Sequence, residues 1–173
     1  MIFPSGTPTQ PEIIAVALSK LYLKRENMFA DVGCGSGSVA ISASKYVKHI
    51  YAIDNRDEAI SAAASNIKEN GLTNISILKG EAAELLLEID IDRAFVGGSK
   101  NIEPVLEILM EKVPRFVVSA ARLETAVQVI NVLKKNNFFI ELIQLQLSRG
   151  SELAGGTMLK PENPVFLIVG GSC

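Results

Sequence analysis

The sequence has few of the residues that build metal sites and disulfide frameworks. Its 173 residues include two cysteines, one histidine and no tryptophan. Cys34 and Cys173 show no metal-ligand spacing, and the single histidine, His49, cannot form a histidine-based metal site by itself. We therefore expect no resident metal and no disulfide framework.

Long apolar runs and an excess of positive charge are also lacking. No run approaches the ~20 apolar residues that cross a bilayer, and the N-terminal residues lack the basic start and apolar stretch of a secretory signal. We expect a cytoplasmic protein without a membrane partner. Seventeen basic residues against 19 acidic ones give a net charge of −2, whereas proteins that bind phosphate backbones concentrate positive charge. No nucleic-acid partner is expected.

The composition that is present is that of an ordinary globular protein. Hydrophobic residues make up 48% of the chain and charged residues 21%, and the length suits one domain with a stable core. There is no internal repeat, no low-complexity tract and no candidate linker. The prediction is a single domain over residues 1–173.

Short β-rich segments alternate with segments of helical periodicity. The candidate strands are residues 28–33, 49–54, 75–80, 93–98, 115–120, 140–147 and 164–170. The first five lack strict polar–apolar alternation, which is typical of parallel strands buried on both faces. Apolar stripes with helical spacing lie within residues 13–21, 59–67, 105–113 and 126–133.

This order predicts an α/β sandwich of about seven strands, mostly parallel, wrapped by right-handed crossovers. The last two candidate strands differ from the others because residues 149–163, which join them, are rich in glycine and carry no helical stripe. We expect a long hairpin there, which places an antiparallel strand at one edge of the sheet.

A glycine-rich loop, DVGCGSGSV (31–39), follows the first candidate strand. Glycines lack Cβ atoms and allow positive φ, so the backbone of such a loop can approach a ligand closely. A nicotinamide site with the pattern G-x-G-x-x-G would need glycine at Ser38. The G-x-G-x-G spacing after Asp31 is instead typical of S-adenosylmethionine sites. A tight strand–helix turn without a ligand is the alternative.

Acidic residues follow the next two candidate strands. Asp54 could accept hydrogen bonds from both ribose hydroxyls, or alternatively cap the following helix. After the third strand, Glu81 could bond the exocyclic amine of adenine and the backbone of Ala82 the ring edge. The carboxyl ends of parallel strands meet at one edge of a sheet, so these groups should share one crevice. Together the groups indicate a Rossmann-like class I methyltransferase domain.

Several segments go beyond this general pattern. They are GTPTQPEI (6–13), DVGCGSGSVAI (31–41), YAIDNRDEAI (51–60), FVGGSKNIEPVLE (95–107), SAARLET (119–125) and SRGSELAGGTM (148–158). With these segments, nearly the whole chain resembles the precorrin-8w decarboxylase family. These are the cobalt-precorrin-6B (carbon 15) methyltransferases (decarboxylating) of anaerobic cobalamin biosynthesis. The VGGS and RG…GTM segments discriminate most, because all class I methyltransferases share the glycine loop.

The resemblance implies methyl transfer from S-adenosyl-L-methionine to a meso carbon of a tetrapyrrole, with decarboxylation of an acetate side chain. The cofactor contacts that it implies are Thr9, Gly33, Cys34, Gly35, Ser36, Gly37, Asp54 and Ala82. It also implies a homotetramer, and it identifies no catalytic acid or base. Two departures stand out: Glu81 occupies a position where the family pattern allows Asp, and KVPRF (112–116) lacks the usual Gly-Gly.

Other residues have both a functional and a structural interpretation. Cations predicted in loops at the same sheet edge could bind the carboxylates of a precorrin, or simply be solvated surface charges. They are Lys100, Arg122, Arg149 and Lys160. Gly97 and Gly98 leave space for a bulky flat acceptor. Cys34 and His49 are expected to have structural roles.

Three other functions remain open on the residues alone. The chain could be a class I methyltransferase for another small molecule, or one for RNA or protein, although it lacks the basic surface and the Asn/Asp-Pro-Pro-aromatic motif. It could also be a non-catalytic cofactor-binding domain. Because little of the chain lies outside the predicted core, we expect subunits to complete each other's substrate clefts through the 149–163 hairpin and the last strands.

Overall fold

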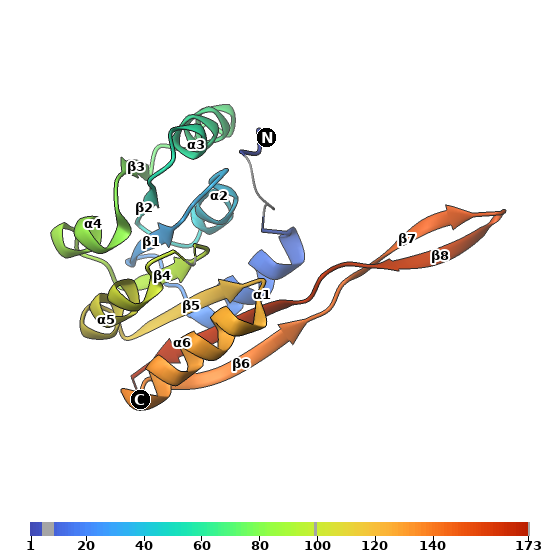
Figure 1. Cartoon of the computed structure of the whole chain (residues 1–173). Coiled ribbons are helices and arrows are strands. Elements are labelled where there is room, and N and C mark those ends of the chain that lie inside the picture. The colour runs from blue at the N-terminus through green and yellow to red at the C-terminus, as the bar shows by residue number, and fades with distance from the viewer. Residues whose placement is uncertain (5–8, 99, 173) are drawn as a thin grey trace.

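The computed structural model of the chain describes residues 1–4, 9–98 and 100–172 (Figure 1). Cys173, Ser99 of the VGGS segment and residues 6–8 of the GTPTQPEI segment lie outside the described residues. Helices and strands alternate along most of the chain. They are α1 (Pro11–Leu21), β1 (Met28–Val32), α2 (Ser38–Ala43), β2 (His49–Asp54), α3 (Asp57–Glu69), β3 (Ile75–Lys79), α4 (Ala82–Glu88), β4 (Arg93–Val96), α5 (Ile102–Lys112), β5 (Arg115–Ala120), α6 (Leu123–Lys135), β6 (Phe139–Leu145), β7 (Ser148–Leu153), β8 (Gly156–Pro161) and β9 (Val165–Gly171).

Seven of these strands form one sheet in the order β3-β2-β1-β4-β5-β9-β6. The strands β1 to β5 pair in parallel, whereas β9 runs antiparallel to both of its neighbours. The prediction of a mostly parallel seven-stranded α/β sandwich is therefore confirmed. The strands β9 and β6 lie at one side of the sheet. The expected antiparallel strand is β9, which lies second from the edge, and β6 is the edge strand.

The burial patterns of β6 and β9 account for their order. Strand β9 (VFLIVGG) is an unbroken apolar run whose last five residues are buried. Strand β6 (FIELIQL) alternates between half-buried and exposed residues, which suits a strand with one solvated face and one open edge. Placing β9 inside and β6 outside removes more apolar surface from water than the reverse order would.

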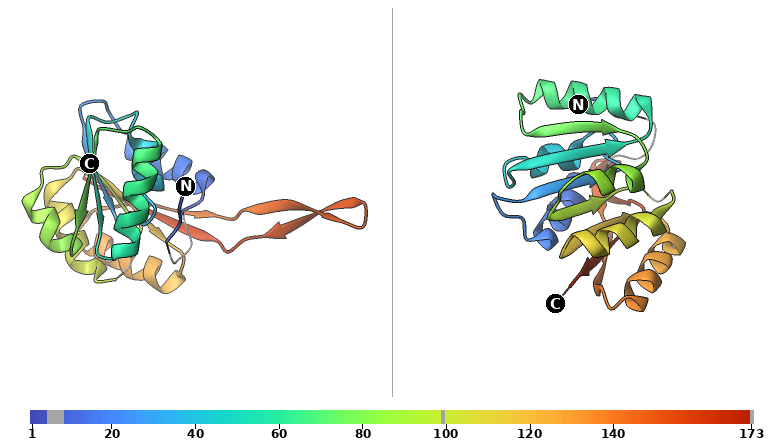
Figure 2. Two further views of the ribbon diagram at one scale, coloured as in Figure 1. Left: turned by 90° about the horizontal axis from the view of Figure 1, so that it is seen from above. Right: turned by 90° about the vertical axis from the view of Figure 1, so that its left-hand side faces the viewer.

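Helices cover both faces of the sheet (Figure 2). The helices α1, α2 and α3 pack on one face, and α4, α5 and α6 pack on the other. The four predicted apolar stripes fall on the helices α1, α3, α5 and α6, and the third extends one residue beyond α5, to Val113. The short helix α4 was not predicted, because its seven residues (AAELLLE) bury only Leu86 fully and form no long stripe.

The predicted hairpin is present as β7 and β8, which form a separate two-stranded ribbon that projects from the body (Figure 1). Ala154 and Gly155, the two residues of its turn, both have positive φ, of 49° and 79°. Positive φ at both central residues is the conformation that matches the twist of a tight hairpin. The ribbon exposes the apolar side chains of Leu153, Met158 and Leu159.

Two expected absences can be examined on the described residues alone. Among these residues, no helix is long and apolar enough to cross a bilayer. Within residues 1–4, 9–98 and 100–172, no three histidine, cysteine or acidic side chains are grouped so that they could hold a metal ion.

Candidate functional site

A cleft of about 390 Å³ opens at the carboxyl ends of β1, β2, β3 and β4. Gly33, Asp54, Glu81 and Ala82 all line it, so the structure brings together the groups that the sequence placed after three different strands. The remaining loop residues Cys34, Gly35, Ser36 and Gly37 continue from Gly33 toward α2.

The loop after β1 depends on its glycines. Gly33, Gly35 and Gly37 have φ values of 74°, 54° and 78°. A Cβ atom on Gly33 would lie 2.7 Å from the backbone nitrogen of Gly98, which follows β4. The two loops therefore pack backbone against backbone, and they line the floor of the cleft with atoms of the main chain.

Asp54 ties this loop to the end of β2. Its carboxylate accepts hydrogen bonds from the Gly35 N–H at 3.0 Å, from the Arg56 N–H at 3.1 Å, and from Nε and Nη2 of Arg56, each at 3.0 Å. The helix α3 begins at Asp57, and its N-cap residue is Arg56. The alternative that Asp54 caps this helix is therefore wrong.

The bonds to Asp54 also set its ionisation. Burial by itself would raise the pKa of the Asp54 carboxyl. The hydrogen bonds from Arg56 and Gly35 outweigh that effect and hold the pKa below its usual range. The cleft thus keeps a negatively charged acceptor at the end of β2.

Asp31 has the opposite behaviour at the end of β1. Its Oδ2 accepts the Ala40 N–H at 2.9 Å, whereas its buried Oδ1 has no hydrogen-bond partner among the described residues. Burial raises the pKa of Asp31 to about 7, and the nearby Asp54 adds to the rise. Burial likewise raises the pKa of the Cys34 thiol, which agrees with the expected structural role of that residue.

The end of β3 contributes a side-chain pair. Asn55 donates a hydrogen bond from Nδ2 to Oε1 of Glu81 at 2.9 Å, and both residues line the cleft. Ala82 is the first residue of α4, so its N–H has no acceptor within the helix. Asn55 was missed in the sequence, where the only signal was an amide side chain directly after Asp54.

Two other candidates occupy separate places. Thr9 lines a second cavity, of about 510 Å³, between the N-terminal segment, α1 and α2, together with Ser38. Thr9 is not among the residues that line the first cleft. Lys100 and Gly97 do line the first cleft, next to Gly98, as expected for a site with space above β4.

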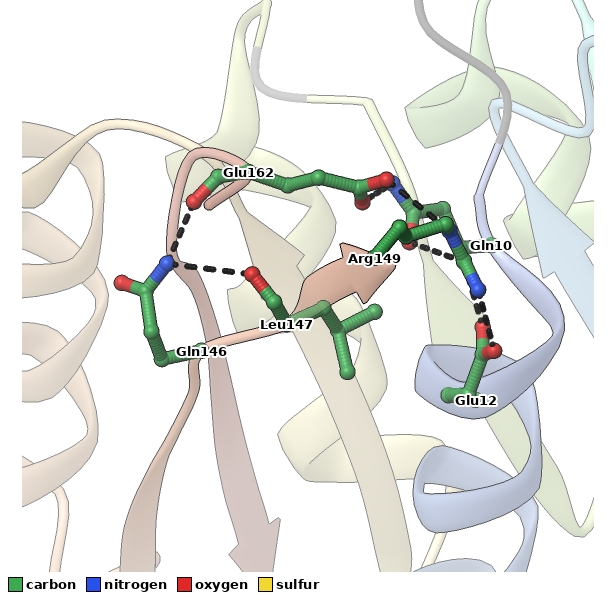
Figure 3. A network of polar contacts seen from close by, with 6 residues as sticks. All are labelled: Gln10, Glu12, Gln146, Leu147, Arg149 and Glu162. Atoms are coloured by element: carbon green, nitrogen blue, oxygen red, sulfur yellow. Dashed lines mark hydrogen bonds and ion pairs between the residues drawn. The ribbon is translucent and has the colours of Figure 1, made fainter. Parts of the chain in front are cut away.

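The position expected for Arg149 and Lys160 is wrong, because they lie in β7 and β8 rather than in loops at the sheet edge. Arg149 bonds both carboxylate oxygens of Glu12 at 2.9 and 3.0 Å, and its Nε bonds Glu162 at 2.9 Å (Figure 3). A further bond of 3.0 Å joins it to Gln10. Arg149 thus fastens the base of the hairpin to the first turn of α1.

The other cation and the histidine have simpler surroundings. Arg122 is the exposed N-cap residue of α6. His49 lies at the start of β2, where Nε2 is 3.0 Å from the Ser76 hydroxyl and the ring packs edge-on against Tyr51. The structural role expected for His49 agrees with these contacts.

The comparisons with known proteins point to one group. A family model described as "Precorrin methyltransferase domain" matches residues 4–169. A protein of Methanosarcina acetivorans named "Probable cobalt-precorrin-6B C(15)-methyltransferase (decarboxylating)" is 53% identical, over 96% of this chain and 94% of its own length. A relative of the same name in Methanocaldococcus jannaschii is 34% identical, over 94% of this chain and 90% of its own length.

Solved structures agree with these relatives. The crystal structure of a precorrin-8w decarboxylase from Methanobacterium thermoautotrophicum has a TM-score of 0.91 at 35% identity, covering 96% of this chain and 93% of that one. A precorrin-6y C5,15-methyltransferase from Geobacter metallireducens has a TM-score of 0.92 at 25% identity, covering 99% and 93%.

The contact between Gly33 and Gly98 predicts a large cost for a side chain at Gly33. We expect Gly33→Ala to lower the free energy of unfolding by about 1–3 kcal/mol more than Gly71→Ala. Both residues have positive φ, so alanine strains the backbone at either position. A Cβ on Gly71 meets nothing within 4 Å, so Gly71→Ala serves as a control that lacks the steric clash. Urea unfolding of the two variants measures the difference, and equal losses would contradict the proposed close contact.

The buried carboxyl of Asp31 predicts a pH dependence of stability. Its folded pKa of about 7 lies above the ordinary value of 3.8, so the native state binds more protons than the unfolded state between these values. This group therefore stabilises the fold less as the pH rises from about 4 to about 7, by at most ~4 kcal/mol in total. In Asp31→Asn, the free energy of unfolding should fall less between pH 4.5 and pH 8 than in the wild type. Parallel pH profiles for the two proteins would contradict this interpretation.

Proposed function

Because the chain belongs to the precorrin methyltransferase family, we propose that it methylates a meso carbon of cobalt-precorrin-6B and decarboxylates an acetate side chain of the same substrate. The observation that carries the proposal is the cleft itself, where the glycine loop, Asp54, Glu81 and Ala82 meet at the carboxyl ends of adjacent strands. Ligands of open α/β sheets bind in that place.

The residues present fit S-adenosyl-L-methionine as methyl donor, which supplies an electrophilic methyl group on a positively charged sulfur. Asp54 and Glu81 line the cleft and offer carboxylate oxygens to the hydroxyl and amino groups of a nucleoside. Two cations, Arg56 and Lys100, line it as well, so the fit rests on these hydrogen-bond acceptors and not on net charge. Asp54 would receive the ribose hydroxyls in place of the Arg56 guanidinium, whose side chain is 44% exposed. The backbone of Ala82 and the carboxylate of Glu81 would receive the adenine edge.

We assign the cofactor contacts to Thr9, to the loop residues Gly33, Cys34, Gly35, Ser36 and Gly37, and to Asp54 and Ala82. Thr9 precedes α1 and lines the neighbouring cavity with Ser38, so its contact would be made from the α1 side of the loop. The loop and Asp54 would hold the methyl donor in place, and the backbone floor at Gly33 and Gly98 would let the acceptor approach it.

The acceptor needs positioning more than acid or base catalysis. A meso carbon of a reduced tetrapyrrole is enamine-like and attacks the methyl carbon directly, and the conjugated ring can take up the electron pair released when carbon dioxide leaves. The chain has to align the two carbons and exclude water. Gly97 and Gly98 leave space for the ring, while Lys100, which lines the same cleft, offers positive charge for its carboxylates.

We further propose that residues 1–173 act as one domain of a cytoplasmic homotetramer whose subunits complete each other's substrate clefts. A single two-stranded ribbon is marginally stable in water, yet β7 and β8 project from the body with Leu153 and Met158 on one face and Leu159 on the other. A second copy of the chain would cover these side chains.

The activity test uses the purified chain with S-adenosylmethionine and cobalt-precorrin-6B. We expect equal amounts of methylated product and carbon dioxide.

Asp54→Ala should weaken binding of S-adenosylhomocysteine by about 1–3 kcal/mol, because charge-assisted hydrogen bonds to the ribose are lost. Titration calorimetry measures the affinity.

Asp57→Ala serves as the matched control, because Asp57 is an exposed acid that pairs with Lys79. Its affinity for S-adenosylhomocysteine should equal that of the wild type. Equal affinity in Asp54→Ala would remove Asp54 from the cofactor site. Thermal stabilisation by NAD as large as that by S-adenosylhomocysteine would remove the methyltransferase assignment.

The assembly proposal predicts a change of mass in solution. Light scattering of the wild type should give four chain masses, and Leu153→Glu/Met158→Glu should dissociate the assembly because it buries charge in the contact. Leu87→Glu, on α4, is the control, since Leu87 is as exposed as Leu153 but lies away from the ribbon. An active wild-type monomer would rule out the proposal. An assembly that persists in the double variant would place the contact elsewhere.

A further inference from the structure

Asn55 has a place in the cleft that the assignments above do not use. It directly follows Asp54, and its side-chain amide donates to Oε1 of Glu81 at 2.9 Å. Both side chains line the same cleft as Asp54 and Ala82. Two consecutive residues at the end of β2 therefore reach two different loops, since Asp54 bonds the glycine loop and Asn55 bonds the acid that precedes α4.

The bond from Asn55 determines how Glu81 is presented. A glutamate carboxylate has two oxygens, and the amide of Asn55 occupies a lone pair of Oε1. The second oxygen, Oε2, can still accept a hydrogen bond from a ligand. Glu81 is exposed and caps α4 without a side-chain hydrogen bond to that helix, so the described contact that orients its carboxylate comes from Asn55.

Orientation matters here because glutamate is flexible. A glutamate side chain has one more rotatable bond than aspartate, and fixing each such side chain costs conformational entropy. A hydrogen bond that fixes the carboxylate before a ligand arrives lowers the entropy that binding must offset. Asn55 supplies that bond from the position that directly follows β2.

The chemistry of the carboxylate selects between purines. An ionised carboxylate accepts hydrogen bonds but donates none. The amino group at position 6 of adenine donates to it, whereas the carbonyl at the same position of hypoxanthine presents a second acceptor and leaves both groups unpaired. Rejection of a ligand that lacks the matching group is the stronger form of selectivity, because the polar groups that the ligand covers on binding then lose their partners.

We propose that Asn55 is a positioning residue that holds Glu81 so that the nucleoside site selects adenine over hypoxanthine. This inference rests on the proposed function, because it assumes that the cleft binds S-adenosylmethionine. Asn55 acts only through Glu81, so its effect should disappear when Glu81 no longer presents a carboxylate.

The experiment compares two probes, S-adenosylhomocysteine and S-inosylhomocysteine, which differ in the base. Titration calorimetry gives both dissociation constants for the wild type, Asn55→Ala, Glu81→Gln and the double variant. Asn136→Ala is the matched control, since Asn136 is an exposed asparagine that also donates one side-chain hydrogen bond but lies far along the chain, at the end of α6.

We expect the wild type to prefer the adenine probe by at least about tenfold, and Asn55→Ala to reduce that preference by about three- to tenfold. Glu81→Gln should bring the preference close to one, because an amide can either accept or donate. The double variant should match Glu81→Gln within about twofold, since the two residues act in series. Asn136→Ala should keep the wild-type preference.

Two results would overturn the inference alone. One is an equal loss of affinity for both probes in Asn55→Ala, with the preference unchanged, and the other is a double variant whose losses multiply. Failure of the wild type to bind S-adenosylhomocysteine at all would overturn the proposed function together with the inference.

Discussion

The ends of β1 and β4 approach each other so closely that only backbone fits between their loops. A Cβ on Gly33 would lie 2.7 Å from the Gly98 nitrogen, and one on Gly97 would lie 3.3 Å from the Gly33 carbonyl oxygen. These strands are neighbours at the centre of the sheet, where the chain order reverses direction. A crevice forms at such a reversal point because the connections diverge to either side. A Cβ atom on Gly33 or Gly97 would push the two loops apart. The absence of these atoms therefore preserves the close packing at the floor of the cleft.

The electrostatics of the cleft follow from where its acids lie relative to water. Asp54 is held ionised by Arg56 and Gly35, whereas burial raises the pKa of Asp31, deeper in the protein, to about 7, and one of its oxygens has no partner in the described part of the chain. Asp31 lies in β1 and Asp54 ends β2, so the two carboxyls lie on adjacent strands beside the glycine loop. A positively charged ligand at the mouth of this cleft would favour the ionised form of each acid, which suits the methyl donor proposed for the site.

The projecting hairpin is fastened to the body by ion pairs. Arg149 bonds Glu12 in two places and Glu162 in one, and these bonds lower the pKa of Glu12 to about 2. The Arg149 guanidinium therefore holds the base of the ribbon against α1. Of the cations considered for substrate carboxylates, Lys100 lies in the cleft and Arg122 caps α6.

The sequence by itself determined the local elements and the parts of the site that lie within one loop. The apolar periodicity located α1, α3, α5 and α6, and the spacing of Gly33, Gly35 and Gly37 located the glycine loop after β1, because both depend on residues close together in the chain. Only the tertiary structure decided that β9 inserts between β5 and β6, that Arg149 pairs with Glu12, and that Asn55 bonds Glu81. Each of these joins residues between 20 and 140 positions apart. Which of these distant residues become neighbours depends on how the sheet and the helices pack to bury apolar surface. A local sequence pattern does not specify that packing.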